Sequence, residues 1–372
     1  MPGLATRSLY GGNMIKANSP IKIGSFTLKN RVTFAPTVKF DYTDDSGKVT
    51  EQLVTHYTER AKGGCGLICV EATAVVPGGR FCRTHMGLWN DEQMEGHKAI
   101  TAGCHQYGAV VIIQLNHTGY GTNPDLGPAI GPSAVKRNGF HGEYTTVEMS
   151  LDEIHEMQQA FVDAAIRAKK AGYDGVQFHG CHGYLINQFM SPSTNFREDA
   201  YGGSTENRAR FCSEMISKVR ELCGPDFLIS VRTSGYENNL EDAIAMAEEY
   251  VKAGCEYLQV SSGLTSLDGL KPFHDSRVTD IQSLGTYFHE HFKGRVPVSC
   301  VGGLLEPEQI HYLIEKEYVD TVDVARAILA DPAFADAVTE GKSYTKCFSC
   351  PACQYGPFTK HMCPAEIVRN KK

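Results

Sequence analysis

Two imidazoles and a phenol follow a short apolar segment near the middle of this sequence. The segment is Gly175–Phe178, and the side chains after it are His179, His182 and Tyr184. A strand that ends in such groups, rather than in turn residues, is typical of an active-site wall. If the chain turns into a helix there, all three side chains could face one cavity, whereas in a capped loop the histidines would only bond the backbone. The spacing leaves both interpretations open. The two histidines could also bind a metal, although the turning loop offers no nearby third ligand.

Four of the thirteen cysteines stand close together near the C-terminus. They are Cys347, Cys350, Cys353 and Cys363, and Pro364 directly follows the last of them. Three cysteines at two-residue spacing with a more distant Cys-Pro are the usual way for one loop to hold a [4Fe–4S] cluster. A structural zinc site can also use four cysteines, but usually as two separated Cys-x2-Cys pairs. The spacing therefore favours iron–sulfur over zinc, and either of them over free thiols.

The composition excludes several classes of function. The chain has 372 residues and a net charge of −7 with the two signs interspersed, so nucleic acid and anionic membranes are not expected partners. No apolar run approaches the roughly 18 residues of a membrane helix, and the N-terminus lacks the apolar stretch of a secretory signal. The remaining cysteines are scattered among apolar residues, which is typical of core positions rather than of a disulfide framework. We expect a cytoplasmic protein.

Short apolar segments alternate with helix-like segments along most of the chain. A hairpin over 21–28 comes first and is expected to close the floor of a barrel. Eight strands are predicted at 31–35, 67–71, 110–115, 175–178, 228–232, 257–261, 296–301 and 321–325. Helices are predicted after them at 51–62, 91–107, 151–171, 204–222, 240–253, 281–292, 307–316 and 331–340. Ser150, with Glu153 three residues later, marks the start of the third helix as a capping box.

Eight strand–helix alternations indicate an α/β fold of the (β/α)8 TIM-barrel type. An open, doubly wound sheet is the alternative, but no Gly-x-Gly-x-x-Gly motif follows any of the predicted strands. We therefore expect three parts. They are an N-terminal lead over 1–18, a barrel over 19–340, and a short cysteine-rich iron–sulfur segment over 341–372.

Such a barrel carries its active site at the carboxyl ends of the strands. The residues expected there are hydrogen-bond donors, one strong cation, and small residues that let a ligand approach the backbone. In strand order they are Pro36-Thr37, Glu71-Ala72, Gln114, His179, Arg232, Ser261-Ser262-Gly263, Gly302-Gly303 and Ala325-Arg326. The last two pairs follow the seventh and eighth strands, where barrels commonly bind phosphate. Any one of these residues could be structural, but the eight together favour a ligand site.

The motif HGCHGYLINQF, followed by SPSTNFREDAYGGSTENRARF, resembles the signature of the Old Yellow Enzyme family of NADH:flavin oxidoreductases. The similarity covers about residues 20–340. The cysteine segment resembles the iron–sulfur segment of the 2,4-dienoyl-CoA reductase and trimethylamine dehydrogenase branch, which has a slightly longer last gap. In that branch the cluster passes single electrons between FMN and a second flavin. The resemblance implies FMN on the barrel and a [4Fe–4S] cluster held by the four cysteines.

The resemblance also implies which strand-end residues bind the cofactor. They are Ala35, Pro36, Thr37, Ala72, Gln114, His179, Arg232, Gly302, Gly303, Ala325 and Arg326. Gln114 would bond the pyrimidine half of the flavin, and Arg232 would lie near its N1, where a cation stabilises the anionic reduced form. The glycine pair and Ala325-Arg326 would hold the phosphate. Val38 departs from the family, because several members have a threonine or cysteine there that contacts the flavin.

For catalysis, the resemblance implies that His179 and His182 bind a substrate oxygen, where two donors stabilise an enolate. Tyr184 matches the family's proton donor, and an ordinary pKa of about 10 suits protonation of a carbanion-like carbon. The expected function is an FMN-dependent ene-reductase that delivers hydride to the β-carbon of an α,β-unsaturated carbonyl compound. Its electrons would come from NAD(P)H or a reduced partner protein and pass through the cluster.

Two other functions are compatible with the sequence. An amine dehydrogenase or demethylase on the same scaffold would need an aromatic pocket for a cation. A non-catalytic barrel could use its cysteine segment as a zinc staple for docking a partner. The expected partners of the enzyme are a small-molecule substrate and an electron-donor protein or flavoprotein subunit, and a homo-oligomer is compatible with the sequence.

Overall fold

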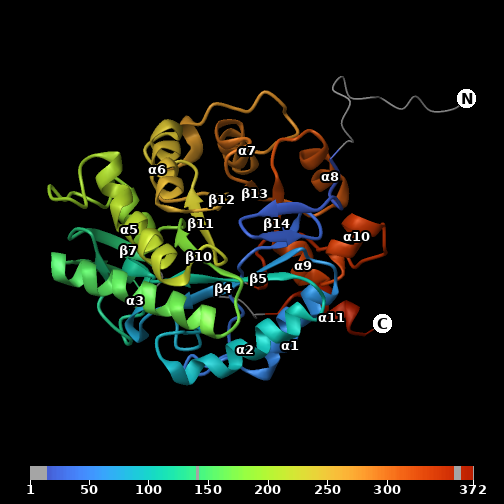
Figure 1. Ribbon diagram of the computed structural model, residues 1–372, viewed down its shortest axis with the longest axis horizontal. Helices are drawn as coiled ribbons and strands as arrows, with labels where there is room; N and C mark the ends of the chain where they lie inside the picture. Colours follow the sequence, from blue (N-terminus) through green and yellow to red (C-terminus); the bar gives the residue numbers. More distant parts are fainter. Residues whose placement is uncertain (1–14, 140–141, 356–361, 372) are drawn as a thin grey trace, which may run out of the picture.

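The structure contains the closed barrel that the sequence predicts. It is a computed structural model that describes residues 15–139, 142–355 and 362–371, so most of the predicted N-terminal lead lies outside the described residues. Eight parallel strands close in the order β10-β11-β12-β13-β14-β3-β4-β5, with helices around them (Figure 1). These strands are β3 (Val32–Phe34), β4 (Leu67–Ala74), β5 (Val110–Asn116), β10 (Gly175–Gly180), β11 (Leu228–Ser234), β12 (Tyr257–Ser261), β13 (Val298–Val301) and β14 (Thr321–Val324).

The outer helices agree with the prediction to within a few residues at most ends. They are α1 (Glu51–Lys62), α2 (Met94–His105), α3 (Leu151–Lys170), α5 (Thr205–Cys223), α6 (Leu240–Ala253), α7 (Asp280–Phe292), α8 (Pro307–Glu315) and α10 (Phe334–Glu340). Three short helices join them: α4 (Leu185–Met190), α9 (Arg326–Ala330) and α11 (Pro364–Arg369). The predicted capping box at the start of α3 is confirmed, since Ser150 accepts from the Glu153 N–H and Glu153 accepts in return from the Ser150 N–H.

Four predicted boundaries were wrong, and proline explains two of them. β13 begins at Val298 rather than at 296, because Pro297 has no N–H to donate to the ladder. The last predicted helix, 331–340, is preceded by α9 and begins only at Phe334, because Pro332 holds Asp331 in an extended conformation. The segment 91–107 splits into a 3-10 turn over Asp91–Gln93 and then α2.

The fourth correction concerns β4, which runs to Ala74 instead of ending at Glu71. Its pairing with β5 shifts between Val70 and Thr73, so Glu71 and Ala72 lie in a β-bulge and not at the end of the strand. A bulge bends its strand and changes the direction of a side chain, and such bulges are frequent beside active sites.

The floor of the barrel is closed as predicted by a hairpin of β1 (Ile21–Ile23) and β2 (Phe26–Leu28). Ile23 and Leu28 are fully buried in a small apolar cluster with residues from the amino ends of several barrel strands, including Leu67 and Tyr257. Burying a side chain of this size contributes roughly 1.5–3 kcal/mol. The opposite end of the barrel is therefore the one left for a ligand.

The long loop after β5 is folded rather than structureless. It contains two small two-stranded sheets, made by β6 (Ile130–Gly131) with β9 (Val147–Glu148) and by β7 (Lys136–Gly139) with β8 (Gly142–Thr145). Across the part of the chain that the structure describes, no helix has the length and apolar character needed to cross a membrane.

Candidate active site

The chain turns sharply directly after β10. His182 has φ +60° and Gly183 has φ +79°, a backbone conformation that residues other than glycine rarely adopt. The His182 N–H donates to the Ser262 carbonyl at 3.2 Å, and the Gly183 N–H donates to the Asn187 Oδ1 at 2.8 Å. These bonds hold the turn, and α4 begins directly after Tyr184.

This turn brings the two imidazoles and the phenol together. His179 Nε2 lies 3.1 Å from His182 Nδ1, and His182 Nε2 lies 2.9 Å from the Ser261 Oγ on β12. The ring of Tyr184 is 4.8 Å from the ring of His179, centre to centre, with the two planes at 67°. The three side chains thus lie together at the carboxyl ends of β10 and β12.

Burial keeps the histidines neutral and the tyrosine protonated. Burial and then the positive charges of His182 and Arg232 lower the pKa of His179 well below its ordinary value. The same two causes, burial and Arg232, lower the pKa of His182. Burial raises the pKa of Tyr184 to about 12.

The structure corrects one point about metal binding at this turn. A third possible ligand does stand nearby, since the ligand atoms of His179, Cys181 and His182 all lie within 4.8 Å of one another. Burial, however, raises the pKa of the Cys181 thiol to about 12, despite its hydrogen bond to Arg232. The two imidazoles already bond each other and Ser261, so the structure shows these histidines in hydrogen bonds.

Arg232, on β11, is the buried cation of the site. It is 5% exposed, and its Nε has no hydrogen-bond partner within the protein. Gln114, on β5, is also buried and donates from Nε2 to the Gln177 Oε1 at 2.7 Å. A buried guanidinium nitrogen without a partner is costly unless a ligand supplies an acceptor, and the pyrimidine edge of a flavin offers such acceptors.

The segment after β3 and the bulge of β4 form the neighbouring wall. The Ala35 N–H donates to the Val324 carbonyl at 3.1 Å, and the Thr37 Oγ1 donates to the Ala35 carbonyl at 3.0 Å, so Ala35–Thr37 is fixed beside β14. Pro36 lies between them. The Ala72 carbonyl lies 2.7 Å from the His85 Nε2. Ala35, Pro36 and Thr37 therefore follow β3 as predicted, whereas Ala72 lies in the bulge of β4 instead of at the end of the strand.

The glycine pair and Ala325-Arg326 follow adjacent strands, as predicted. Gly302 and Gly303 have φ of +109° and +64°, and a side chain added to Gly303 would meet no atom within 4 Å. The Gly302 carbonyl is held by the Gln282 Nε2 at 2.7 Å, and Ala325 precedes the first turn of α9, which begins at Arg326. Open space beside a glycine at positive φ lets a ligand such as a phosphate group approach the backbone there.

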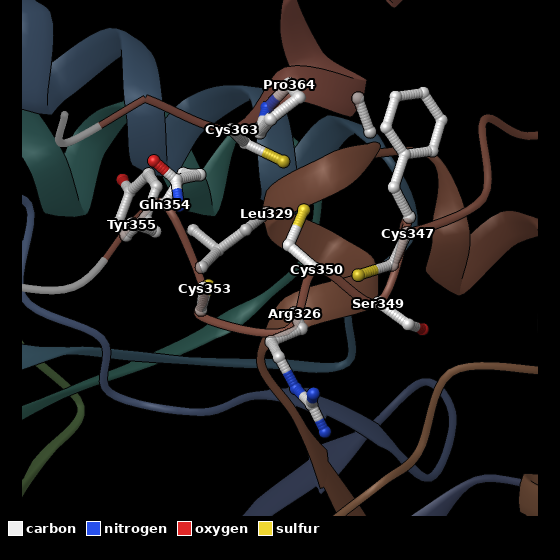
Figure 2. A pocket seen from close by; sticks show the side chains of 12 residues that line it. Arg326, Leu329, Cys347, Ser349, Cys350, Cys353, Gln354, Tyr355, Cys363 and Pro364 are labelled. Atoms are coloured by element: carbon white, nitrogen blue, oxygen red, sulfur yellow. The ribbon is translucent and has the colours of Figure 1, made fainter. Parts of the chain in front are cut away.

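The four C-terminal cysteines line one pocket together with Arg326, Leu329 and Tyr355. Figure 2 shows the sulfur atoms of Cys347, Cys350 and Cys363 turned toward a common space. Cys353 is exposed, and the other three are partly buried. No three of these sulfur atoms lie mutually within 4.8 Å, because among the described residues only the His179, Cys181 and His182 group meets that distance.

Sequence reasoning named Glu71 as a strand-end residue but missed Glu237, a second buried acidic residue near the site. Glu71 accepts from the Tyr57 hydroxyl at 2.8 Å and from the Lys39 N–H at 3.1 Å, and burial raises its pKa to about 7. Glu237 is fully buried and accepts from the Asn187 Nδ2 at 2.9 Å. The position of Glu71 beside Ala72 hinted at a role in the site. No pattern in the sequence marks Glu237.

The chain is similar to known proteins over most of its length. Residues 18–344 match the model of the NADH:flavin oxidoreductase / NADH oxidase family. A "NADPH dehydrogenase" of Bacillus pumilus (strain SAFR-032) is 36% identical over 330 residues, which are 87% of this chain and 94% of that protein.

Two solved structures share the fold over most of this chain. A 2-naphthoyl-CoA reductase in complex with 2-naphthoyl-CoA has a TM-score of 0.83 and 26% identity, and it covers 91% of this chain and 55% of its own. The Old Yellow Enzyme homologue from Zymomonas mobilis has a TM-score of 0.76 and 27% identity, and it covers 89% of this chain and 94% of its own. This chain thus spans about half of the first protein and nearly all of the second.

The matched region includes the eight barrel strands, the histidine turn after β10, the buried arginine on β11 and the glycines after β13. The chain therefore belongs to the NADH:flavin oxidoreductase / NADH oxidase family, and it is a flavin-dependent oxidoreductase.

Proposed function

We propose that this protein is an FMN-dependent ene-reductase that acts on an α,β-unsaturated carbonyl compound. The observation that carries this proposal is the neutral pair His179 and His182, whose facing nitrogens lie 3.1 Å apart beside the protonated Tyr184. Reduced FMN, when bound, supplies hydride to the β-carbon of the substrate.

The histidines would hold the carbonyl oxygen. If the Ser261 hydroxyl donates to His182 Nε2, the ring proton of His182 stands on Nδ1, the nitrogen that faces His179. In the structure one of these two facing nitrogens donates to the other, so a substrate oxygen would replace that bond, and both imidazoles could then donate to it as negative charge develops. A charged imidazolium pair would repel itself and Arg232, so neutrality suits this role.

Tyr184 would supply the proton to the α-carbon. Its pKa of about 12 keeps the phenol protonated at neutral pH, and the phenol remains a far stronger acid than the carbanion-like carbon. Arg232 would provide a fixed positive charge at the pyrimidine end of the flavin, and Gly302, Gly303 and Arg326 would hold its phosphate.

We also propose that Cys347, Cys350, Cys353 and Cys363 hold a [4Fe–4S] cluster, which supplies single electrons when bound. Zinc with four thiolates at about 2.3 Å requires its sulfurs roughly 3.8 Å apart, whereas in a cubane each thiolate binds a different iron and the sulfurs lie farther apart. Three cysteines at two-residue spacing with a more distant Cys-Pro support the cubane. The electrons would come from NAD(P)H or a reduced partner protein.

An amine dehydrogenase would need an aromatic pocket for a cation, and its candidates in the sequence are Trp89, Tyr10, Tyr42, Tyr120 and Phe273. Tyr42 already covers the ammonium group of Lys39 at 4.4 Å, and Phe273 packs against Tyr287 and Tyr318. Tyr120 lies beside Gly183 of the histidine turn and stacks on Tyr144, so it is the aromatic residue that this alternative would use. Tyr10 lies outside the described residues.

The experiment is anaerobic purification with flavin and metal analysis, followed by enone reduction in Tyr184→Phe. Flavin reduction should stay nearly normal, while reoxidation by the enone slows by roughly 10²–10⁴-fold, the usual contribution of a general acid. Tyr107→Phe is the control, because Tyr107 is exposed near the amino end of β5. A loss below about tenfold would mean that water or another residue supplies the proton.

A further inference from the structure

Two buried cations lie in the wall between the barrel and the cysteine segment. Lys39 is 3% exposed and follows the Ala35–Thr37 segment, and Arg60 is 1% exposed in the last turn of α1. Within the described residues, neither side chain makes an ion pair with a carboxylate. A buried charge without a partner is unfavourable, so these two residues need an explanation.

Lys39 joins the flavin wall to the cysteine segment. Its backbone N–H donates to Glu71, and its ammonium nitrogen lies 4.4 Å from the centre of the Tyr42 ring and 4.2 Å from that of Tyr355. Tyr355 stands two residues after Cys353 and lines the same pocket as the four cysteines. The aromatic faces attract the cation but do not neutralise it.

Arg60 also lies near Tyr355, and most of its N–H donors have no partner within the protein. Its Nη1 donates to the His56 carbonyl at 2.5 Å, and its carbon Cζ lies 5.3 Å from the centre of the Phe34 ring. Its Nε and Nη2 have no partner within the protein, and the buried Tyr355 hydroxyl also has none. The carboxylates that act from a distance are Glu366 and Glu71 on Lys39, and Glu366 and Glu59 on Arg60.

Four cysteine thiolates on a metal centre form an anion that such cations would offset. A [4Fe–4S] cluster in its oxidised state has two positive charges against four thiolates, and zinc has the same balance. Cys363 already acts electrostatically on Lys39. We propose that Lys39 and Arg60 are the counter-charges of the metal–thiolate centre, and that they set its stability and reduction potential.

This inference rests on the proposed cluster and says nothing about the enone reaction. The reduction potential of a cluster depends on its net charge and on the charges around it, so loss of a nearby cation should make the potential more negative. For a one-electron couple, each tenfold change in the ratio of reduced to oxidised cluster corresponds to about 59 mV. Loss of the cation should also speed release of the metal to a chelator.

The test compares Lys39→Met with Lys39→Arg, which keeps the charge. Arg31→Met is the matched control, because Arg31 is also buried with an unpartnered Nε but faces Asp320 and Glu317 instead of the cysteine segment. Iron content, flavin content, the cluster potential and the rate of metal loss are measured in each holoprotein. Arg60→Met and Arg60→Lys repeat the test at the second position, and Lys39→Met carries it if Arg60→Met does not fold.

We expect Lys39→Met to keep its flavin, to shift the cluster potential negative by at least about 59 mV, and to lose metal several-fold faster. Lys39→Arg and Arg31→Met should behave as the wild type does. If the protein holds an iron cluster and Lys39→Met changes neither its reduction potential nor its rate of metal loss, this inference is wrong. The ene-reductase proposal would be unaffected by that result. If the wild type holds zinc, the rate of metal loss alone decides. If it holds no metal, both the cluster and the counter-charge inference are wrong.

Discussion

Replacing Glu71 with glutamine should make the stability of this protein less dependent on pH. Glu71 is 1% exposed in the β4 bulge, and a single oxygen, Oε2, accepts from both the Tyr57 hydroxyl and the Lys39 N–H. A glutamine oxygen can accept the same two bonds. The substitution therefore removes the titration of the carboxyl group while it keeps the hydrogen bonds.

The size of the effect follows from the pKa of Glu71. Burial raises it from 4.5 to about 7 in the folded protein. Between these values the unfolded chain has released the proton and the folded chain still holds it, so stability falls as pH rises through this window. The contribution is present below pH 4.5 and is lost above pH 7. One pKa unit is about 1.4 kcal/mol, so the loss between pH 5 and pH 8 comes to about 2.5 kcal/mol.

The assay is denaturant unfolding of the wild type and Glu71→Gln at pH 5 and pH 8, with the same flavin occupancy in both. At pH 5 the variant and the wild type should have similar free energies of unfolding. At pH 8 the difference should have moved by about 2.5 kcal/mol in favour of the variant. Glu156→Gln, on the exposed face of α3, removes the same charge without removing a buried carboxyl group. A difference between wild type and Glu71→Gln that does not change with pH would refute the reasoning.

Three other expectations can be tested. Cys350→Ala should lose iron and keep FMN, and it should still reduce the enone when its flavin is reduced chemically; wild-type turnover of this variant with NADH alone would contradict an electron-conducting cluster. Glu237→Gln should lower the free energy of unfolding by about 1–3 kcal/mol, because Glu237 accepts from Asn187 and from the Leu264 N–H. It should also weaken several-fold the binding of a phenol whose oxygen is held by the histidine pair. An unchanged Kd for the phenol would show that this network does not position the histidine turn. Since the pKa of His179 lies well below its ordinary value, phenol affinity should show no histidine-linked inflection between pH 6 and pH 8 in a spectral titration, and an inflection near pH 6.5 would mean that the pair becomes charged.

The fold was largely predictable because local patterns and the barrel agree. α1 begins and ends where the pattern predicts, at Glu51 and Lys62, and the Ser150–Glu153 capping box fixes the start of α3. The errors lie where a proline or an extra residue interrupts the regular spacing of apolar residues. Pro332 delayed the start of the last predicted helix to Phe334, and the extra residue in β4 moved Glu71 and Ala72 into a bulge, which alternation alone does not reveal.

The side chains of the candidate site were predictable where they follow strands in a motif. His179, His182 and Tyr184 are close in sequence, so their meeting needs only one turn. The supporting residues are different in kind. Glu237 contacts Asn187, which lies 50 residues earlier in the sequence, and Lys39 contacts Tyr355, near the other end of the sequence. Only the tertiary fold places these residues together.

The closure of the barrel between β3 and β14 has a consequence for how the protein is made. The Thr33 hydroxyl donates to the Val322 carbonyl at 3.0 Å, a contact between positions 289 residues apart. Because synthesis proceeds from the N-terminus, β3 waits with one open edge until the last strand leaves the ribosome, and an open edge can pair with another chain. Two predicted ligand segments flank this seam. Ala35–Thr37 directly follows the first barrel strand, and Ala325-Arg326 directly follows the last. The nascent chain therefore has no complete flavin site to stabilise it, and late release makes timely closure, rather than final stability, the step most exposed to aggregation.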